Sequence, residues 1–292
     1  MTQEANNPKS AAQGIEGVER PQIRWKVILQ IAAGFAIVWL TSFMVVPYVG
    51  YWGVGISAVL TLVALGFGFY IWRLTRKSAA IVDILKGATD EEGRRSALQK
   101  LSSKAESNDA LAALAQAQLL ARDQPAEAMT VLEGIDLKKA PAMIQDDVRA
   151  NLGLLYLAHN RVRDARELAD LIRLDRQPQP KAKAMYASVI AESFARTGKA
   201  EEAQKLLETY RPEDEAYGEV RPLLLRAEIF THLATKKRNL AKRSLERLAG
   251  IEPMMVASFT QRGTPIELQN FARQLLAKRG MIPKQRMRVR MH

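Results

Sequence analysis

The sequence predicts an all-α fold in which a two-helix transmembrane hairpin is followed by an α-solenoid of helical hairpins. Two uncharged, largely apolar stretches of 20 residues lie close together near the N-terminus, at residues 27–46 and 53–72. Beyond them the chain is rich in strong helix formers, and an alanine recurs at spacings of 37, 38 and 38 residues. The chain has no cysteine, which excludes disulfides, thiolate metal sites and cysteine nucleophiles.

Residues 1–22 are polar and show no hydrophobic periodicity. A segment of this composition cannot bury enough apolar surface to offset the entropy lost on folding. We therefore expect a flexible cytoplasmic tail here.

Residues 23–77 are expected to form the transmembrane hairpin, with spans at about 27–46 and 53–72. A helix of 20 residues is about 30 Å long, which is the thickness of the hydrocarbon layer. The six residues between the spans include Pro47 and Gly50, which favour a turn. A cleaved signal peptide and a buried hairpin in a soluble protein are the alternatives, but the long charged leader and the matched flanks favour membrane insertion.

The flanks of the spans predict the orientation. Arg24 and Lys26 precede the first span, Arg73 and Arg76 follow the second, and the connecting loop carries no charge. By the positive-inside rule both termini are cytoplasmic, and the protein is expected in a bacterial inner membrane.

Residues 78–250 are expected to form the repeat domain, with a degenerate helix pair at about 78–104. The recurring alanines each lie early in an amphipathic helix, and they are Ala128, Ala165, Ala203 and Ala241. In three units the preceding helix carries a small residue followed by an aromatic one three positions later, as in the pairs Gly153/Tyr156, Ala191/Phe194 and Ala227/Phe230. A small residue lets two helices approach closely, so each unit reads as a helical hairpin that must stack on its neighbours.

Over roughly residues 108–250 this pattern resembles the tetratricopeptide repeat (TPR) family. The family pattern combines the small residue and the aromatic with Gly or Asn at the turn and Ala in the second helix. Two units carry all four features, at Gly153, Tyr156, Asn160 and Ala165 and again at Ala191, Phe194, Gly198 and Ala203. The arrangement also resembles bacterial inner-membrane proteins that carry a two-helix anchor ahead of such units.

The resemblance implies a partner-binding groove lined by the first helix of each unit. Carried onto this chain, the groove residues are Asp147, Asn151, Leu154, Ala158, Met185, Ser188, Glu192, Arg196, Arg221, Glu228 and His232. Some family members grip a partner's terminal carboxylate with an Asn in one unit and two cations in the next. Asn151 fits that pattern, but Met185 and Val189 occupy the cation positions, so this clamp is not expected.

No motif in the sequence predicts catalysis, a metal or a cofactor. The three histidines His159, His232 and His292 lack a second ligand at suitable spacing, and no phosphate-binding loop or nucleophile elbow is present. The acidic cluster at 213–215 is explained by its place at a helix start, where carboxylates complement the dipole. We therefore expect a non-enzymatic protein without a cofactor.

Nearly all of the net charge of +12 lies near the C-terminus, where residues 251–292 are expected to form a basic helix, at about 265–279, and a tail. Residues 73–235 contain 25 basic and 25 acidic residues, whereas residues 236–292 contain 14 basic and 3 acidic ones. The basic residues singled out are Lys236, Lys237, Arg238, Lys242, Arg243, Lys284, Arg286, Arg288 and Arg290.

This basic segment must attract an anionic partner unless it only keeps the domain soluble. Anionic lipid is the nearest candidate for a protein held at a membrane, and nucleic acid or acidic protein are the others. The sequence thus favours a membrane-anchored scaffold that recruits or assembles protein partners at the cytoplasmic face. The alternative is a membrane tether for nucleic acid or ribosomes through residues 236–292.

Overall fold

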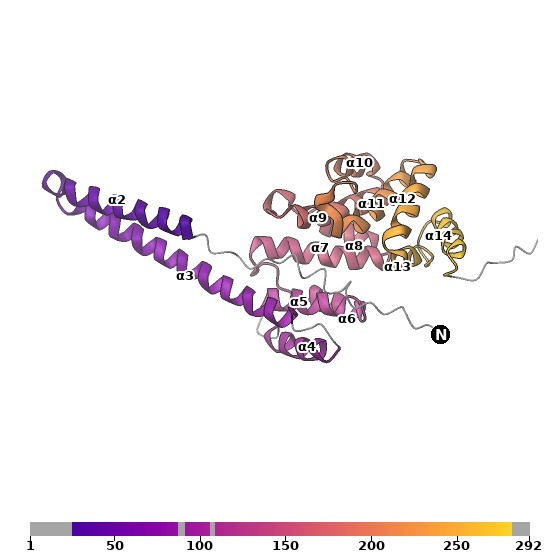
Figure 1. The fold of residues 1–292 in the computed structure, drawn as a ribbon, viewed down its shortest axis with the longest axis horizontal. Helices are drawn as coiled ribbons and strands as arrows, with labels where there is room; N and C mark the ends of the chain where they lie inside the picture. The colour runs from indigo at the N-terminus through magenta and orange to yellow at the C-terminus, as the bar shows by residue number, and fades with distance from the viewer. Residues whose placement is uncertain (1–24, 87–90, 106–108, 282–292) are drawn as a thin grey trace, which may run out of the picture. The chain divides into compact units, whose positions relative to one another are not determined.

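A computed structural model describes residues 25–86, 91–105 and 109–281. All of its regular secondary structure in these ranges is helical, which confirms the all-α prediction. By its contacts the chain divides into two compact units, Met1–Ser103 and Lys104–His292, and each is described by itself (Figure 1). The tail expected at residues 1–22 lies outside the described residues.

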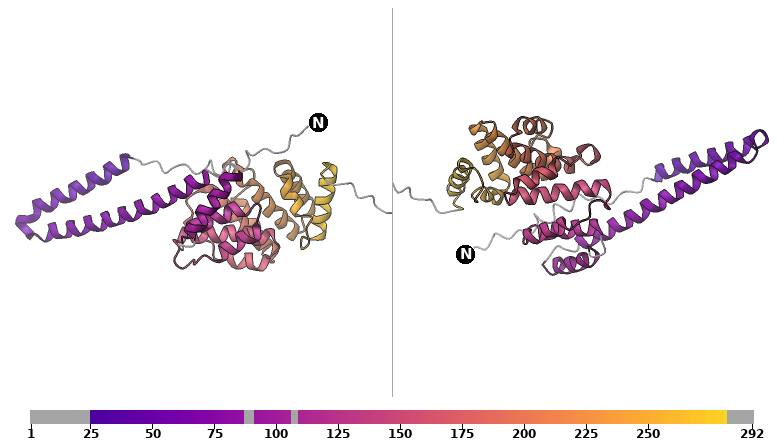
Figure 2. Two further views of the ribbon diagram at one scale, coloured as in Figure 1. Left: turned by 90° about the horizontal axis from the view of Figure 1, so that it is seen from below. Right: turned by 180° about the vertical axis from the view of Figure 1, so that it is seen from behind.

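The first unit contains a helical hairpin formed by α2 (Trp25–Val49) and α3 (Trp52–Lys86). The two helices lie side by side and antiparallel (Figures 1 and 2). Gly50 closes the first helix in a left-handed conformation, with φ of 69°, and its N–H donates to the Val46 carbonyl at 2.9 Å. Glycine adopts this conformation without a steric penalty, and it is the usual residue after a helix end.

Two features of the hairpin differ from the sequence prediction. The turn is shorter than the six-residue loop expected, because Pro47 still lies inside α2. The second helix continues well beyond Trp72 to Lys86, so the expected domain boundary at residue 77 falls within α3. Residues 73–86 contain neither Gly nor Pro, and nothing in them stops a helix.

Polar contacts join the two helices of the hairpin. The indole Nε1 of Trp39 donates to the Thr61 hydroxyl at 3.1 Å, and the hydroxyls of Ser42 and Ser57 lie 2.5 Å apart. Ser57 is buried between the helices although both helices are apolar. Among the residues that the structure describes, no helix combines the length and the hydropathy needed to cross a membrane. Helix α4 (Glu91–Ala105) follows.

The second unit is built from consecutive helical hairpins. The helices and short 3-10 turns, in chain order, are α5 (Ala110–Leu120), α6 (Pro125–Glu133), α7 (Ala142–Ala158), α8 (Val162–Ala169), η1 (Leu174–Arg176), α9 (Pro180–Arg196), α10 (Ala200–Thr209), η2 (Glu215–Val220), α11 (Arg221–Ala234), α12 (Arg238–Ile251), α13 (Pro253–Ser258) and α14 (Ile266–Lys278). The expected basic helix at 265–279 is thus present as α14, whereas the short α13 was not predicted. Helices α5, α7, α9 and α11 each contact the next of the four, and each also contacts the helix that follows it.

The recurring alanines lie where the paired helices meet. Each is the fourth residue of its helix, in α6, α8, α10 and α12, and each has no exposed surface. Gly153 plays a related part between units, because a Cβ added there would lie 2.8 Å from Cγ1 of Val189 on α9. These small residues let the helix backbones approach closely, as the repeat pattern predicted.

A second repeated feature is a left-handed residue between the helices of three hairpins. Asn160, Gly198 and Lys236 have φ values of 62°, 91° and 61° and are spaced by 38 residues. The residue that follows each of them donates its backbone N–H to a carbonyl in the last turn of the preceding helix, at 2.8 to 2.9 Å. The donor–acceptor pairs are Arg161 to Tyr156, Lys199 to Phe194 and Lys237 to His232, as in a helix C-terminal capping motif. The 3-10 turns η1 and η2 fall between units.

The core of the second unit runs continuously from α9 to α14. Its largest fully buried side chains include Leu224 of α11, Leu245 of α12, Phe259 directly after α13 and Leu268 of α14. Because α13 and α14 contribute to this core, residues 251–281 complete the repeat domain.

Candidate functional site

The groove residues expected on α7 are partly buried. Asp147, Asn151 and Leu154 are each half-buried, and Ala158 is exposed at the end of the helix. The Asn151 amide donates to the Asp147 carbonyl at 2.8 Å, so its amide group is oriented along its own helix.

Asp147 belongs to a polar cluster between α7 and α9. The Tyr186 hydroxyl donates to its Oδ1 and accepts from the Gln177 amide at 3.0 Å. Burial raises the pKa of Asp147, and burial beside this carboxylate raises the pKa of Tyr186. Next to it, the fully buried Asp146 pairs with Arg149 at 2.9 Å.

On α9 the expected groove residues are more enclosed. Met185 is half-buried, whereas Ser188 and Glu192 are only 2% exposed. The Ser188 hydroxyl donates to the Met185 carbonyl at 2.6 Å. Neither Ser188 nor Glu192 is therefore free to contact a partner in this structure.

On α11 the expected residues Arg221 and Glu228 are half-buried. Glu228 accepts from the Ser244 hydroxyl at 2.8 Å and lies 3.5 Å from Nε2 of His232. Burial by itself would raise its pKa, but hydrogen bonds from His232 and Ser244, together with the charges of His232 and Arg247, outweigh this effect, and its pKa is lowered. Of the expected groove residues, Ala158 is exposed, and Asn151, Leu154, Met185 and Arg221 are half-buried and partly accessible.

A second enclosed charge cluster of this unit consists of two arginines and one glutamate. The Glu192 carboxylate accepts from Arg196 of the same helix at 3.0 Å and from Arg226 of α11 at 2.9 and 3.1 Å. The side chains of Arg196 and Arg226 are 9% and 12% exposed. This cluster, which we call the Glu192 network, links α9 to α11 and carries one more positive than negative charge.

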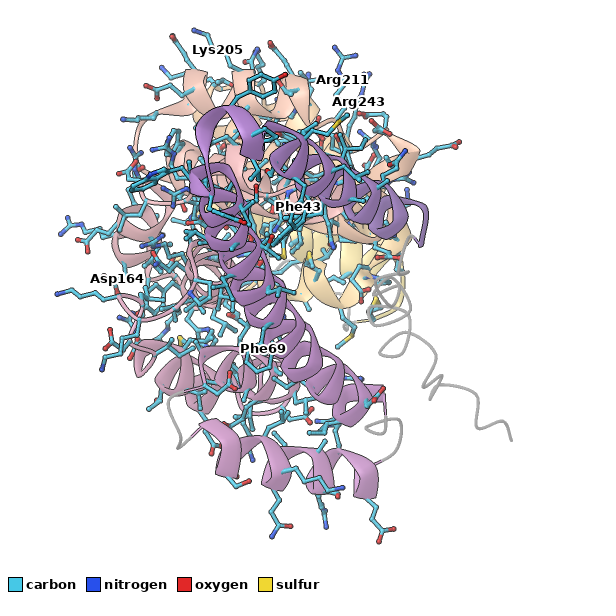
Figure 3. All side chains as sticks on the ribbon, turned by 90° about the vertical axis from the view of Figure 1, so that its left-hand side faces the viewer. Phe43, Phe69, Asp164, Lys205, Arg211 and Arg243 are labelled. Carbon is cyan, nitrogen blue, oxygen red and sulfur yellow. The ribbon has the colours of Figure 1, made fainter. Side chains whose placement is uncertain are left out.

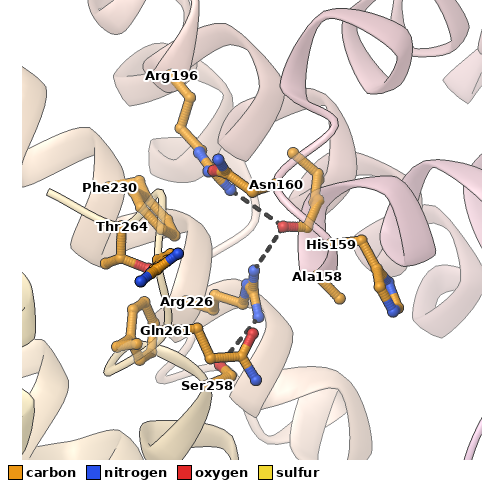
Figure 4. A pocket seen from close by; sticks show the side chains of 12 residues that line it. Ala158, His159, Asn160, Arg196, Arg226, Phe230, Ser258, Gln261 and Thr264 are labelled. Carbon is orange, nitrogen blue, oxygen red and sulfur yellow. Dashed lines mark hydrogen bonds between the residues drawn. The ribbon is translucent and has the colours of Figure 1, made fainter.

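The same two arginines close the C-terminal end of α7. Both donate to the Leu157 carbonyl at 3.2 Å, reaching it from two sides (Figure 4). Arg196 also donates to the side-chain oxygen of the left-handed Asn160. Carbonyls in the last turn of a helix lack intrahelical donors, and cations are favoured there by the helix dipole.

A cavity of about 150 Å³ lies beside the Glu192 network. Its lining comes from the end of α7, from α9 and α11 and from the segment 258–264, and it consists of Leu157, Ala158, His159, Asn160, Arg196, Arg226, Phe230, Ser258, Phe259, Gln261, Arg262 and Thr264 (Figure 4). The segment 258–264 closes down on α7 through Gly263, where a Cβ would lie 2.0 Å from the Asn160 amide nitrogen.

Aromatic rings support the arginines of the cavity. The guanidinium of Arg196 lies 4.5 Å from the ring centre of Phe230, and that of Arg226 lies 5.5 Å from the ring centre of Phe259. Such contacts favour the charged form, yet burial lowers the pKa of Arg196. Burial and the neighbouring Arg226 charge thus act against the charged form of Arg196, whereas Glu192 favours it.

The basic residues predicted on the repeat domain lie on and before α12. Lys242 and Arg243 are exposed, Lys237 donates to Gln204 at 2.9 Å, and Arg238 pairs with Glu267 at 2.5 Å. The remaining predicted basic residues lie outside the described part of the chain and are Lys284, Arg286, Arg288 and Arg290.

The repeat pattern identifies Glu192 and Arg196 but not Arg226, the residue that connects them to α11. A signal was available, because Arg226 lies within the otherwise apolar run Leu223–Phe230 together with only one other charge. A charged side chain in such a run is rarely buried without a partner.

Within the described ranges, no group of acidic and histidine side chains is arranged to hold a metal ion. In comparisons with known proteins, the chain matches no family model, no curated protein and no solved structure.

Proposed function

We propose that this protein is a non-enzymatic scaffold, anchored in a bacterial inner membrane by α2 and α3, whose TPR-like units recruit or assemble protein partners in the cytoplasm. The observation that carries the proposal is the apolar surface of the hairpin. Fifteen exposed large hydrophobic side chains lie between Ile37 and Phe69, among them Leu40 and Met44 at 66% and 78% exposure. Two others, Phe43 and Phe69, are labelled in Figure 3. Soluble monomers rarely expose a contiguous apolar surface of this kind.

The polar groups of the hairpin support the same proposal. The Ser42–Ser57 and Trp39–Thr61 contacts turn hydroxyls and the indole N–H toward the partner helix. Small and hydroxylated residues at helix contacts are typical of helix pairs in lipid, where a polar group has no water to bond. Membrane anchoring is thus supported by the uncharged stretches 27–46 and 53–72, by the exposed apolar side chains and by the polar contacts between the helices.

The scaffold part of the proposal is supported by the stacked hairpins. Each first helix contacts the next first helix, so their side chains form one continuous surface along the domain. Extended surfaces of this kind are what helical repeat proteins use to bind partners. The accessible residues Asn151, Leu154 and Met185 belong to this surface.

Site-specific photocross-linking in cells tests the scaffold proposal. A photoreactive amino acid at Asn151, Leu154 or Met185 should give the same cross-linked partner band. The matched control is Glu201, an exposed residue on the second helix of its hairpin, which should give no such band. If all four positions give the same bands, or none gives any, the groove is not a binding surface.

The same experiment separates the scaffold from the nucleic-acid tether. Exposed Lys242 and Arg243 favour the tether only through general electrostatic attraction, which is strongly salt-dependent. For a protein scaffold, nuclease treatment before irradiation should leave the groove cross-links unchanged. Loss of the cross-links on nuclease treatment would favour the tether.

A further inference from the structure

The cavity beside the Glu192 network has a surplus of positive charge. Three guanidinium groups line it, those of Arg196, Arg226 and Arg262, whereas no carboxylate does. Among the residues that the structure describes, the acidic side chain bonded to Arg196 and Arg226 is Glu192, which is not part of the lining. Buried charge without a counterion is costly, and Arg196 and Arg226 are about nine-tenths buried.

The cavity also has hydrogen-bond donors beyond those its own structure uses. Arg196 and Arg226 together make seven hydrogen bonds, to Glu192, Leu157, Asn160 and Ser258, which is fewer than their N–H groups can make. Among the described residues, neither the Thr264 hydroxyl nor the Arg262 guanidinium makes a side-chain hydrogen bond. Donors therefore face the cavity from α9, from α11 and from the segment 258–264.

We propose that this cavity binds a phosphate group, either as free inorganic phosphate or as the terminal group of a small phosphomonoester. Three cations against one carboxylate leave an excess that a dianion balances and a single carboxylate does not. The donors come from separate elements around the cavity, an arrangement that suits a tetrahedral anion better than a planar one. Guanidinium groups are well suited to phosphate because their paired N–H groups match two of its oxygens. This inference does not depend on the proposed membrane anchor or on the groove.

Equilibrium dialysis of the full-length protein in a nonionic detergent tests the proposal, with radiolabelled inorganic phosphate as the probe. Binding should saturate at one phosphate per chain. Arg262→Gln should weaken it about tenfold, the effect of losing one charge-assisted hydrogen bond. Thr264→Val should weaken it less. Arg262 is exposed and Thr264 is half-buried, and far-UV circular dichroism should show that both variants are folded.

Arg243→Gln is the matched control, because it removes the same charge from an exposed residue outside the cavity. It should leave phosphate affinity within about twofold, as expected for screened surface charges. If Arg262→Gln and Arg243→Gln weaken binding equally, or if no saturable binding is found, the proposal is overturned.

Competing ligands identify the source of the phosphate. Displacement of the label by glycerol 3-phosphate at lower concentration than by unlabelled phosphate would support a phosphomonoester, and the reverse order would support free phosphate. Displacement by acetate at lower concentration than either would overturn the assignment to phosphate.

Discussion

Four alanines set the distance between the helices of the repeat domain. Each is fully buried at the same position of its helix, so there is no room there for a longer side chain. Cores of this density tolerate added volume poorly, because neighbouring side chains must leave their preferred rotamers.

Ala165→Leu and Ala203→Leu should each lower the free energy of unfolding by roughly 1–3 kcal/mol through overpacking. For a domain of this size each kcal/mol corresponds to a fall of about 2–4 °C in Tm. Thermal unfolding followed by circular dichroism measures the effect. Glu201→Asp, at an exposed residue in the first turn of α10, keeps the charge that favours the helix start, so it is the control and should leave Tm nearly unchanged. Equal Tm values for all variants would mean that these alanines do not lie at a close helix contact.

Asp147 makes the stability of the folded protein depend on pH. Its pKa is raised by burial, so the folded state disfavours the ionised carboxylate. The stability contributed by this group is greatest below its ordinary pKa and declines as the pH rises through its folded value.

Asp147→Asn should therefore become more stable relative to the natural protein as the pH rises from about 4 to about 7. The amide oxygen of Asn can still accept from the Tyr186 hydroxyl, so the hydrogen bond is kept. Urea unfolding midpoints of both proteins at the two pH values measure this difference. A difference that is independent of pH, or that grows toward low pH, would contradict the burial effect.

At the scale of elements, the three left-handed residues between paired helices differ in the steric penalty of their backbone conformation. Gly198 adopts its conformation freely and Asn160 tolerates it, but Lys236 does so against a steric penalty. Lys236 is exposed, and its backbone N–H donates to the Leu233 carbonyl at 3.0 Å, so the turn and not the side chain fixes it.

Lys236→Gly should raise the free energy of unfolding by about 1 kcal/mol by removing this penalty. Lys236→Ala removes the same charge but keeps a Cβ, so it should give no such gain. Tm values of the two variants check the prediction. If both variants gain equally, the effect comes from charge; if neither gains, the left-handed residue is not strained.

The elements that the sequence predicted well are those that local patterns define. The period of the alanines and the small–aromatic pairs located the paired helices from α5 to α12, because helix contacts recur at fixed spacings along the chain. The left-handed turn at Lys236 escaped notice, because lysine gives no signal for that conformation whereas Asn160 and Gly198 do. The length of α3 was underestimated, because a change from apolar to polar residues marks the end of a hydrophobic stretch and not the end of a helix.

The candidate site was only partly predictable for a different reason. Carrying a family groove onto the chain identifies positions by helix face, and it selected Glu192 as a binding residue. The structure places Glu192 in contact with Arg226, a residue 34 positions later on another helix. No local pattern reports such a pairing, so neither the network nor the cavity beside it follows from periodicity.

At the scale of the whole molecule, the proposal combines an apolar hairpin and a helical repeat domain in one chain. Among the described residues, the hairpin exposes fifteen large apolar side chains between Ile37 and Phe69, whereas the second unit exposes seven and has a continuous core from α9 to α14. The proposed membrane anchor would account for this difference, because lipid would cover the apolar side chains of the hairpin.

The natural chain has no cysteine, so single introduced cysteines can report its topology without interference. The informative positions are Tyr51 in the turn of the hairpin, Leu40 within α2 and Glu201 in the repeat domain. In intact bacterial cells, a membrane-impermeant maleimide should label Tyr51→Cys but not Glu201→Cys. After cell disruption Glu201→Cys should be labelled, whereas Leu40→Cys should stay poorly reactive, because a thiolate does not form in hydrocarbon. Labelling of Glu201→Cys in intact cells would contradict the orientation, and labelling of Leu40→Cys as fast as Glu201→Cys in disrupted cells would contradict the membrane anchor itself.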